Sequence, residues 1–106
     1  MNLARIEPAG DRRFRVSGVL DYGTVAALEA RGRLLLAATA DAVVDLSGVE
    51  RANSAGLALL LEWLDQARVA RRRLRYEGVP ESLLEIAATS NVSALLPVIA
   101  TGEGTP

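Results

Sequence analysis

The residues best placed to do chemistry lie in one short stretch, Arg51-Ala52-Asn53-Ser54-Ala55-Gly56-Leu57, just before a long apolar run. A hydroxyl at the start of a helix can cap it by accepting a hydrogen bond from a backbone N–H, here that of Gly56 or Leu57, and such a cap is worth about 1 kcal/mol. The same hydroxyl of Ser54 can also receive a phosphate, which adds about −1.5 to −2 charges. The two roles are compatible, so both a cap and a modification site stay open at Ser54.

The composition excludes the commonest active sites. The 106 residues include no His and no Cys, which removes Ser-His-Asp and Cys-His catalysis and thiolate zinc sites. The acids nearest to Ser54 are Asp41, Asp45 and Glu50, and none has a partner at a spacing typical of metal binding or acid–base catalysis. We therefore expect no enzymatic activity, no metal and no cofactor.

Charge and hydropathy indicate the environment. The net charge is −1, and all twelve cationic residues are Arg. One basic cluster, residues 68–75, fits a solvated helix end, with contact to anionic lipid or an acidic partner as the alternative; nucleic-acid binding is not expected because no aromatic residues interleave it. The longest apolar run, residues 57–61, is far shorter than the roughly 20 residues of a membrane span. We expect a cytoplasmic domain without a leader or a direct membrane span, held at any membrane by a partner.

The elements that must position Ser54 follow from the hydrophobic pattern. We expect strands at 3–7, 12–20, 42–46 and 74–77, and helices at 24–37, 55–71, 81–88 and 92–96. The first two strands form an antiparallel pair, the third is buried on both faces because its apolar run does not alternate with polar residues, and 47–50 is a loop. The order ββαβαβαα predicts an α/β domain over residues 1–96, a small mixed sheet covered by helices on at least one face, with a flexible tail over 97–106.

The helix at 55–71 has more apolar surface than one core contact needs. Its expected core stripe is Leu57, Leu60, Leu61, Leu64 and the aliphatic stem of Arg68. Leu59 and Trp63 lie on a neighbouring face. This surplus indicates a surface for a partner.

The segment VVDLSGVERANSAGLALLLEWLDQA, residues 43–67, resembles the central strand, loop and helix of STAS domains, the fold of anti-sigma factor antagonists. The similarity is carried by Asp45-Leu46-Ser47-Gly48-Val49 and by Ser54-Ala55-Gly56-Leu57. It implies the STAS fold over about residues 5–96. Within the family the chain most resembles the MlaB-type subunit of the Mla phospholipid-transport ABC system, because Asn53 stands where antagonists usually have Asp, and Ala55 where they usually have a second hydroxyl.

The MlaB-type resemblance implies a non-enzymatic subunit that binds and regulates the ATPase of an ABC transporter maintaining outer-membrane lipid asymmetry. Its partners would be the ATPase and, through it, an inner-membrane permease. The domain would then be cytoplasmic and peripherally associated with the inner membrane. The expected partner-binding residues are Arg51, Asn53, Ser54, Ala55, Gly56, Leu59 and Trp63.

The alternative is an anti-sigma factor antagonist. In that branch, the resemblance implies that an anti-sigma factor kinase phosphorylates the hydroxyl at the position of Ser54 and is thereby released. A third class, a module binding a nucleotide or another small ligand, has no positive feature in the sequence.

Overall fold

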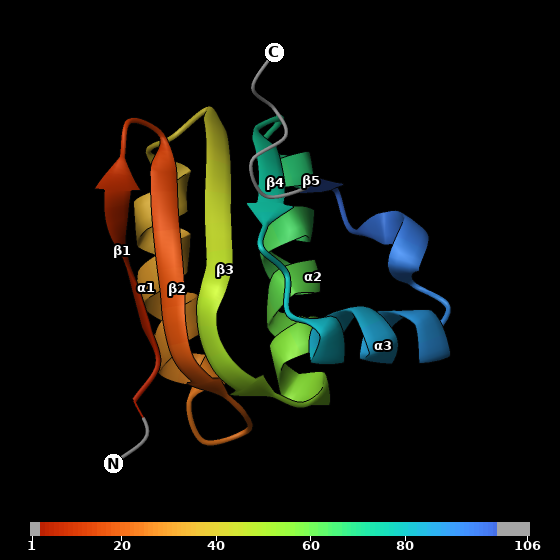
Figure 1. Ribbon diagram of the computed structural model, residues 1–106. Coiled ribbons are helices and arrows are strands. Elements are labelled where there is room, and N and C mark those ends of the chain that lie inside the picture. Colours follow the sequence, from red (N-terminus) through yellow and green to blue (C-terminus); the bar gives the residue numbers. More distant parts are fainter. Residues whose placement is uncertain (1–2, 100–106) are drawn as a thin grey trace.

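A mixed β-sheet forms the centre of the protein, and its strands lie side by side in chain order (Figure 1). The structure, a computed structural model, describes residues 3–99. The five strands found there are β1 (Arg5–Gly10), β2 (Arg13–Leu20), β3 (Asp41–Ala52), β4 (Arg73–Glu77) and β5 (Val98–Ile99). The helices are α1 (Val25–Ala37), α2 (Ser54–Val69) and α3 (Glu81–Thr89), followed by a short 3₁₀ turn, η1 (Ser93–Leu95).

The strand pairings confirm the predicted fold class. β1 and β2 are antiparallel, joined by a turn in which Arg12 has a positive φ of 59°. The pairs β2–β3, β3–β4 and β4–β5 are parallel, so each connection within them is a crossover. The β1–β2 ladder is irregular between Pro8 and Gly10.

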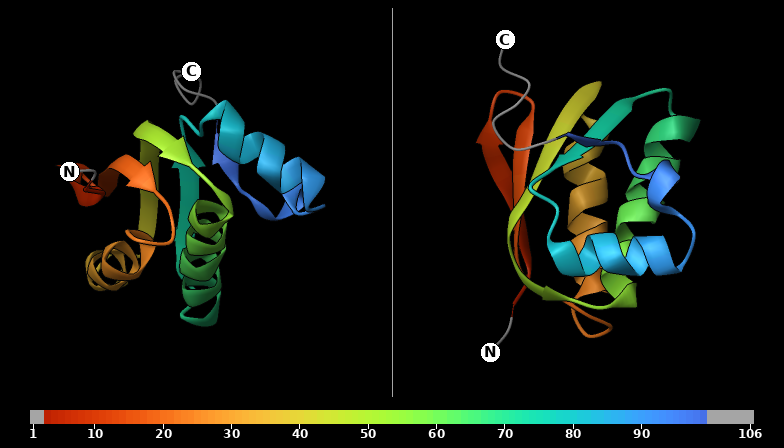
Figure 2. Two further views of the ribbon diagram at one scale, coloured as in Figure 1. Left: turned by 90° about the horizontal axis from the view of Figure 1, so that it is seen from below. Right: turned by 45° about the vertical axis from the view of Figure 1, so that its right-hand side comes forward.

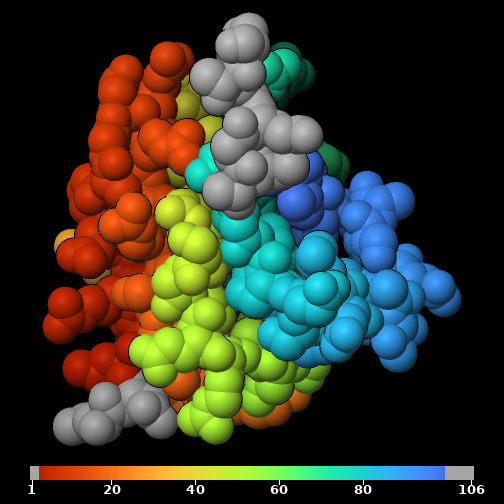
Figure 3. All heavy atoms as spheres, viewed as in Figure 1, coloured from red at the N-terminus to blue at the C-terminus, as the bar shows by residue number. Residues whose placement is uncertain are grey.

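The helices α1 and α2 pack on one face of the sheet, and α3 packs against α2 (Figure 2). Among the described residues, no helix covers the other face of β1–β3, whose side chains form the front surface in Figure 3. Alternate residues of β2 are accordingly buried beneath the helices, as Phe14 and Val16 are. This arrangement fits the predicted sheet with helices on at least one face.

β3 is longer than predicted, and it is exposed on one side. It continues through Ser47–Glu50, which was expected to be a loop, because this segment goes on pairing with β2. Its side chains alternate, with Val44 and Leu46 buried while Asp45 and Ser47 lie on the open face. The prediction of a strand buried on both faces was therefore wrong, because no layer packs on that side.

The buried side of α2 differs in part from the predicted stripe. Leu57 and Leu60 are buried as expected, but Leu61 and Leu64 are only partly buried. Leu59 and Trp63 take their place, with Trp63 only 1 % exposed. Trp63 fits because residue 32 of α1 is glycine: a Cβ there would collide with the Trp63 ring.

The chain end holds the last differences. The expected helix at 92–96 is only the η1 turn, and the sheet extends past residue 96 because β5 pairs with β4 and the N–H of Tyr76 donates to the carbonyl of Pro97 at 2.9 Å. The tail was expected to begin at residue 97, but residues 97–99 belong to the sheet. The rest of the expected tail, residues 100–106, lies outside the described residues, as do residues 1–2. Within residues 3–99, no helix combines the length and apolar character needed to cross a membrane.

Candidate partner-binding site at the start of the second helix

Two chain segments meet where β2 and β3 end. In the parallel ladder Leu20 pairs with Ala52, and the N–H of Asn53 donates to the carbonyl of Leu20 at 3.1 Å. The turn after β2 and the start of α2 therefore lie side by side at one end of the sheet (Figure 1). Ligand sites of open α/β sheets commonly lie beyond the carboxyl ends of strands, so this end is the natural candidate.

Asn53, not Ser54, caps α2. Asn53 has an extended backbone, and its Oδ1 accepts a hydrogen bond from the N–H of Ala55 at 2.8 Å. Its carbonyl accepts from the N–H of Gly56 at 2.9 Å. The expected cap hydrogen bond from Ser54 is wrong because Ser54 is already the first helical residue. Its hydroxyl is left available for other contacts.

Ser54 contacts a residue outside the seven expected partner-binding residues. Its Oγ lies 2.9 Å from the hydroxyl of Tyr22, in the turn between β2 and α1. That turn is fixed by local bonds: Gly23 N–H donates to Asp21 Oδ1 at 2.9 Å, and the Thr24 hydroxyl donates to the Val19 carbonyl at 2.7 Å. Tyr22 is 76 % exposed. The sequence offered one signal for this role of Tyr22: it is an aromatic residue in a strand-to-helix turn, in a chain with only 4 % aromatics.

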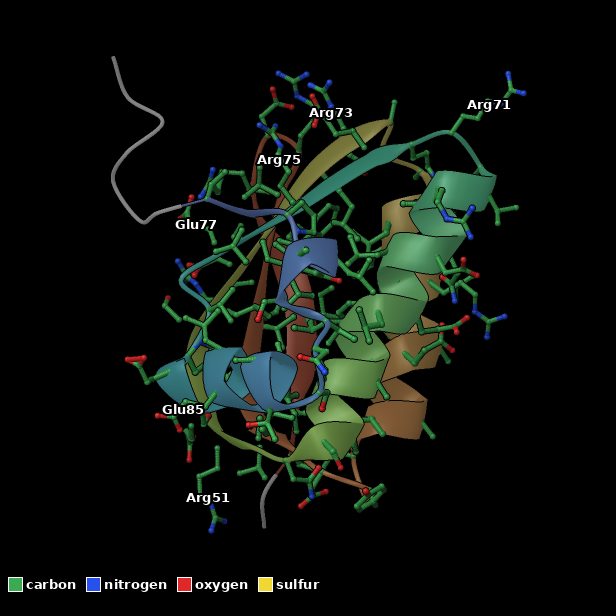
Figure 4. The ribbon with its side chains drawn as sticks, turned by 90° about the vertical axis from the view of Figure 1, so that its right-hand side faces the viewer. Arg51, Arg71, Arg73, Arg75, Glu77 and Glu85 are labelled. Atoms are coloured by element: carbon green, nitrogen blue, oxygen red, sulfur yellow. The ribbon has the colours of Figure 1, made fainter. Side chains whose placement is uncertain are left out.

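The seven expected partner-binding residues divide into a surface group and a buried group. Arg51 and Ser54 are exposed and Asn53 is half-buried; Arg51 extends outward at this end of the molecule (Figure 4). The buried group is Ala55, Gly56, Leu59 and Trp63.

The buried group cannot offer whole side chains to a partner in this conformation. At Gly56, an added Cβ would lie 3.0 Å from Leu20 Cβ, so its close approach is to the chain's own β2. Trp63 is enclosed between α1 and α2, with Nε1 donating to the Glu29 carbonyl at 3.4 Å. Trp63 is therefore a core residue, which corrects its expected role as a contact.

Two of the three acids nearest to Ser54, Asp41 and Asp45, form ion pairs on the open sheet face. Arg75 pairs with Asp41 at 3.1 Å and Arg15 with Asp45 at 3.5 Å. Burial raises the pKa of Asp45, but hydrogen bonds from Ser47 and the pairing with Arg15 outweigh it, so the pKa lies below its ordinary value of 3.8. In the part of the chain that the structure describes, no cluster of three or more acidic residues could hold a metal ion.

The basic cluster lies at the far end of α2 from Ser54, and the sixteen residues of that helix span about 24 Å. Arg68 pairs with Asp65 at 2.6 Å, and Arg72 donates to the carbonyl of Leu36 at 2.8 Å. Arg71 and Arg73 extend outward at this end, opposite Arg51 (Figure 4). The cluster is therefore separate from the Ser54 surface.

The sheet order, the two helices on one face and the exposed serine at the start of α2 define the class: this is the STAS fold. Solved structures of other proteins share it, among them the following three. An anti-sigma factor antagonist from Mycobacterium paratuberculosis is 23 % identical with a TM-score of 0.74, covering 95 % of this chain and 87 % of that one. The anti-sigma factor antagonist SpoIIAA, unphosphorylated, is 13 % identical with a TM-score of 0.72, covering 95 % and 90 %. Its phosphorylated form from Bacillus is 13 % identical with a TM-score of 0.68, covering 95 % and 93 %.

A family model described as MlaB, STAS domain, matches residues 6–97. The chain therefore belongs to the MlaB-type STAS domain family, a family of regulatory and binding domains. A comparison with curated proteins found no significant match. Since the solved structures are less than 25 % identical, their similarity establishes the fold alone.

Proposed function

We propose that this domain is a non-enzymatic subunit that binds and regulates the ATPase of an ABC phospholipid transporter. The observation that carries the proposal is an exposed Ser54, flanked by uncharged Asn53 and Ala55, at the start of α2 in a chain of the MlaB type. Through the ATPase the domain would sit beneath an inner-membrane permease, in the cytoplasm, and contribute to outer-membrane lipid asymmetry.

The surface around Ser54 suits contact by shape. The hydroxyl is small, and Ala55 and Ala58 beside it are smaller still, so a partner backbone can approach the start of α2 closely. A negative charge placed there would be tolerated by the free N–H groups of the helix. If a docked protein buried the same charge without an opposite charge beside it, the burial would weaken binding by several kcal/mol.

The test is the affinity of the domain for the transporter ATPase of its own organism. Ser54→Glu should weaken binding at least about tenfold, because it buries a charge, whereas Ser54→Ala should change the dissociation constant by less than about threefold. Titrating wild-type domain into the ATPase should change its rate of ATP hydrolysis. Full binding by Ser54→Glu, or no binding by wild type, would refute the proposal.

The second candidate is an anti-sigma factor antagonist switched by phosphorylation of Ser54. The exposed hydroxyl of Ser54 favours it, since a kinase needs access to that oxygen. Incubation with the anti-sigma factor kinase of the same organism, followed by intact-mass measurement, separates the two functions. A phosphorylated form that vanishes in Ser54→Ala supports the switch; an unmodified mass supports the transporter subunit.

A further inference from the structure

A groove with an apolar floor runs between the first halves of α1 and α2. Its volume is about 460 Å³. α1 contributes Val25 and Ala26, and α2 contributes Ala55, Ala58 and Leu59. The groove exists because three of these five side chains are methyl groups, which leave the space between two neighbouring helices unfilled.

The groove is closed at its far end by the packing described above. One turn further along, the ring of Trp63 occupies the space left by Gly32 and fills the gap between the helices. The open part thus covers residues 55–62 of α2, about 10 Å of helix, beside residues 25–29 of α1. That length matches roughly two turns of an incoming helix.

The two ends of the groove differ in chemistry. At the end near the carboxyl ends of β2 and β3 stands the exposed ring of Tyr22, whose hydroxyl contacts Ser54. The groove is therefore continuous with the Ser54 surface. At the opposite end stand two carboxylates, Glu29 and Glu62, one from each helix.

These two carboxylates are held together by one amide. Gln66 Nε2 donates to Glu29 Oε2 at 2.7 Å and to Glu62 Oε2 at 3.1 Å. Arg33 approaches the same Oε2 of Glu29 at 3.5 Å. Within residues 3–99, neither Oε1 atom accepts a hydrogen bond from a side chain, so the pair keeps acceptors for a further cation.

We propose that this groove binds an apolar segment of the ATPase that carries a Lys or Arg about two helical turns from the residue contacting Ser54. The apolar part would lie on Ala55, Ala58 and Leu59 beside Tyr22. The cation would reach Glu29 and Glu62, whose charge selects this segment over an anionic one. The inference rests on the proposed function, because it assigns chemistry to the partner of the same surface.

Matched variants test the two parts of the groove. Glu62→Arg reverses the charge at an exposed position, and Ala58→Trp fills the floor from an exposed position. Their controls lie on α3, outside the groove, where Glu85→Arg and Ala88→Trp make the same changes at exposed positions. Denaturation curves of all four proteins confirm that each is folded before its affinity for the ATPase is measured.

We expect both groove variants to weaken ATPase binding about tenfold or more and both α3 variants to stay within about twofold of wild type. Replacing the Lys or Arg of the ATPase segment by Glu should restore binding to the Glu62→Arg variant. The chain has no Cys, so Ala58→Cys can carry a single environment-sensitive fluorophore. Its emission should shift to shorter wavelength when ATPase is added, and the same label at Ala88→Cys should not shift.

The outcomes separate this inference from the proposed function. If wild type binds the ATPase and Ser54→Glu does not, while the groove variants bind normally, the groove proposal is wrong and the proposed function stands. An equal loss of ATPase affinity in the groove variants and the α3 variants would also overturn the groove proposal. If wild type fails to bind the ATPase, both proposals fall together.

Discussion

The hydroxyl groups of Tyr22 and Ser54 lie 2.9 Å apart, although the two residues are 32 positions apart in the chain. This contact joins the turn after β2 to the first residue of α2. It is possible because β2 and β3, despite two shifts in their register, stay paired up to their ends, where Leu20 pairs with Ala52. The exposed serine of this family member therefore has an aromatic neighbour at hydrogen-bonding distance.

Removing the Tyr22 hydroxyl should change the binding surface without changing stability. Tyr22→Phe should leave the free energy of unfolding within about 0.5 kcal/mol of wild type, because both hydroxyls are exposed to water. Tyr22→Ala should also leave the fold intact but weaken ATPase binding about tenfold, since it removes the aromatic end of the groove. Urea denaturation and a binding titration check the two parts. A loss of more than about 1 kcal/mol in Tyr22→Phe would show that the contact stabilises the fold instead.

The cap of α2 can be assigned by a pair of substitutions. Asn53→Ala should lower the free energy of unfolding by about 1 kcal/mol, because it removes the acceptor of the Ala55 N–H. Ser54→Ala is the matched control and should cost less than about 0.5 kcal/mol. Chemical denaturation of both variants measures the difference. A larger loss of stability in Ser54→Ala than in Asn53→Ala would show that Ser54 caps the helix instead.

The contact between Gly32 and Trp63 predicts an exception to helix propensity. Gly→Ala inside a helix usually stabilises by about 1 kcal/mol, but Gly32→Ala should destabilise by about 1–3 kcal/mol, because the added methyl overlaps the Trp63 ring. In the background of Trp63→Leu, the same substitution should cost much less. Thermal or urea unfolding of the four proteins of this cycle checks it. Equal costs in both backgrounds would exclude the ring as the cause.

The lowered pKa of Asp45 predicts a pH-dependent contribution to stability. Because the pKa is lower in the folded than in the unfolded protein, the carboxylate stabilises the fold above the unfolded-state value and loses this effect as the pH falls through the folded-state value. Asp45→Asn should therefore be less stable than wild type at pH 7, and the difference should shrink below about pH 4. Urea unfolding at a series of pH values measures this. Asp65→Asn, at an exposed pair, is the control and should stay within about 0.5 kcal/mol. A difference that does not change with pH would contradict the assignment.

Local patterns predicted most elements of the fold. The antiparallel pair at the start, the helix α2 and the helix following Pro80 each depend on apolar spacing or capping residues within a few positions. Membership of the MlaB-type family could also be predicted from the sequence, because the motif that indicates it lies in the continuous segment 43–67.

The features that local patterns missed depend on distant residues. β3 extends to Ala52 because β2 continues beside it, and Gly48 lets the two strands approach, with an added Cβ only 3.0 Å from Ser17 Cβ. Trp63 is buried because a glycine lies opposite it on α1. The contact of Tyr22 with Ser54 follows from strand register. None of these pairings has a signature in the sequence around one residue.

The two edges of the sheet have a consequence for self-association. β1 includes Pro8, which has no N–H, and its ladder is irregular there; β5, at the other edge, has two residues. An incoming strand would therefore find few consecutive backbone donors and acceptors on either side. In the described part of the chain, edge-to-edge growth into fibrils is disfavoured, and concentrated solutions of the domain should resist this route of aggregation.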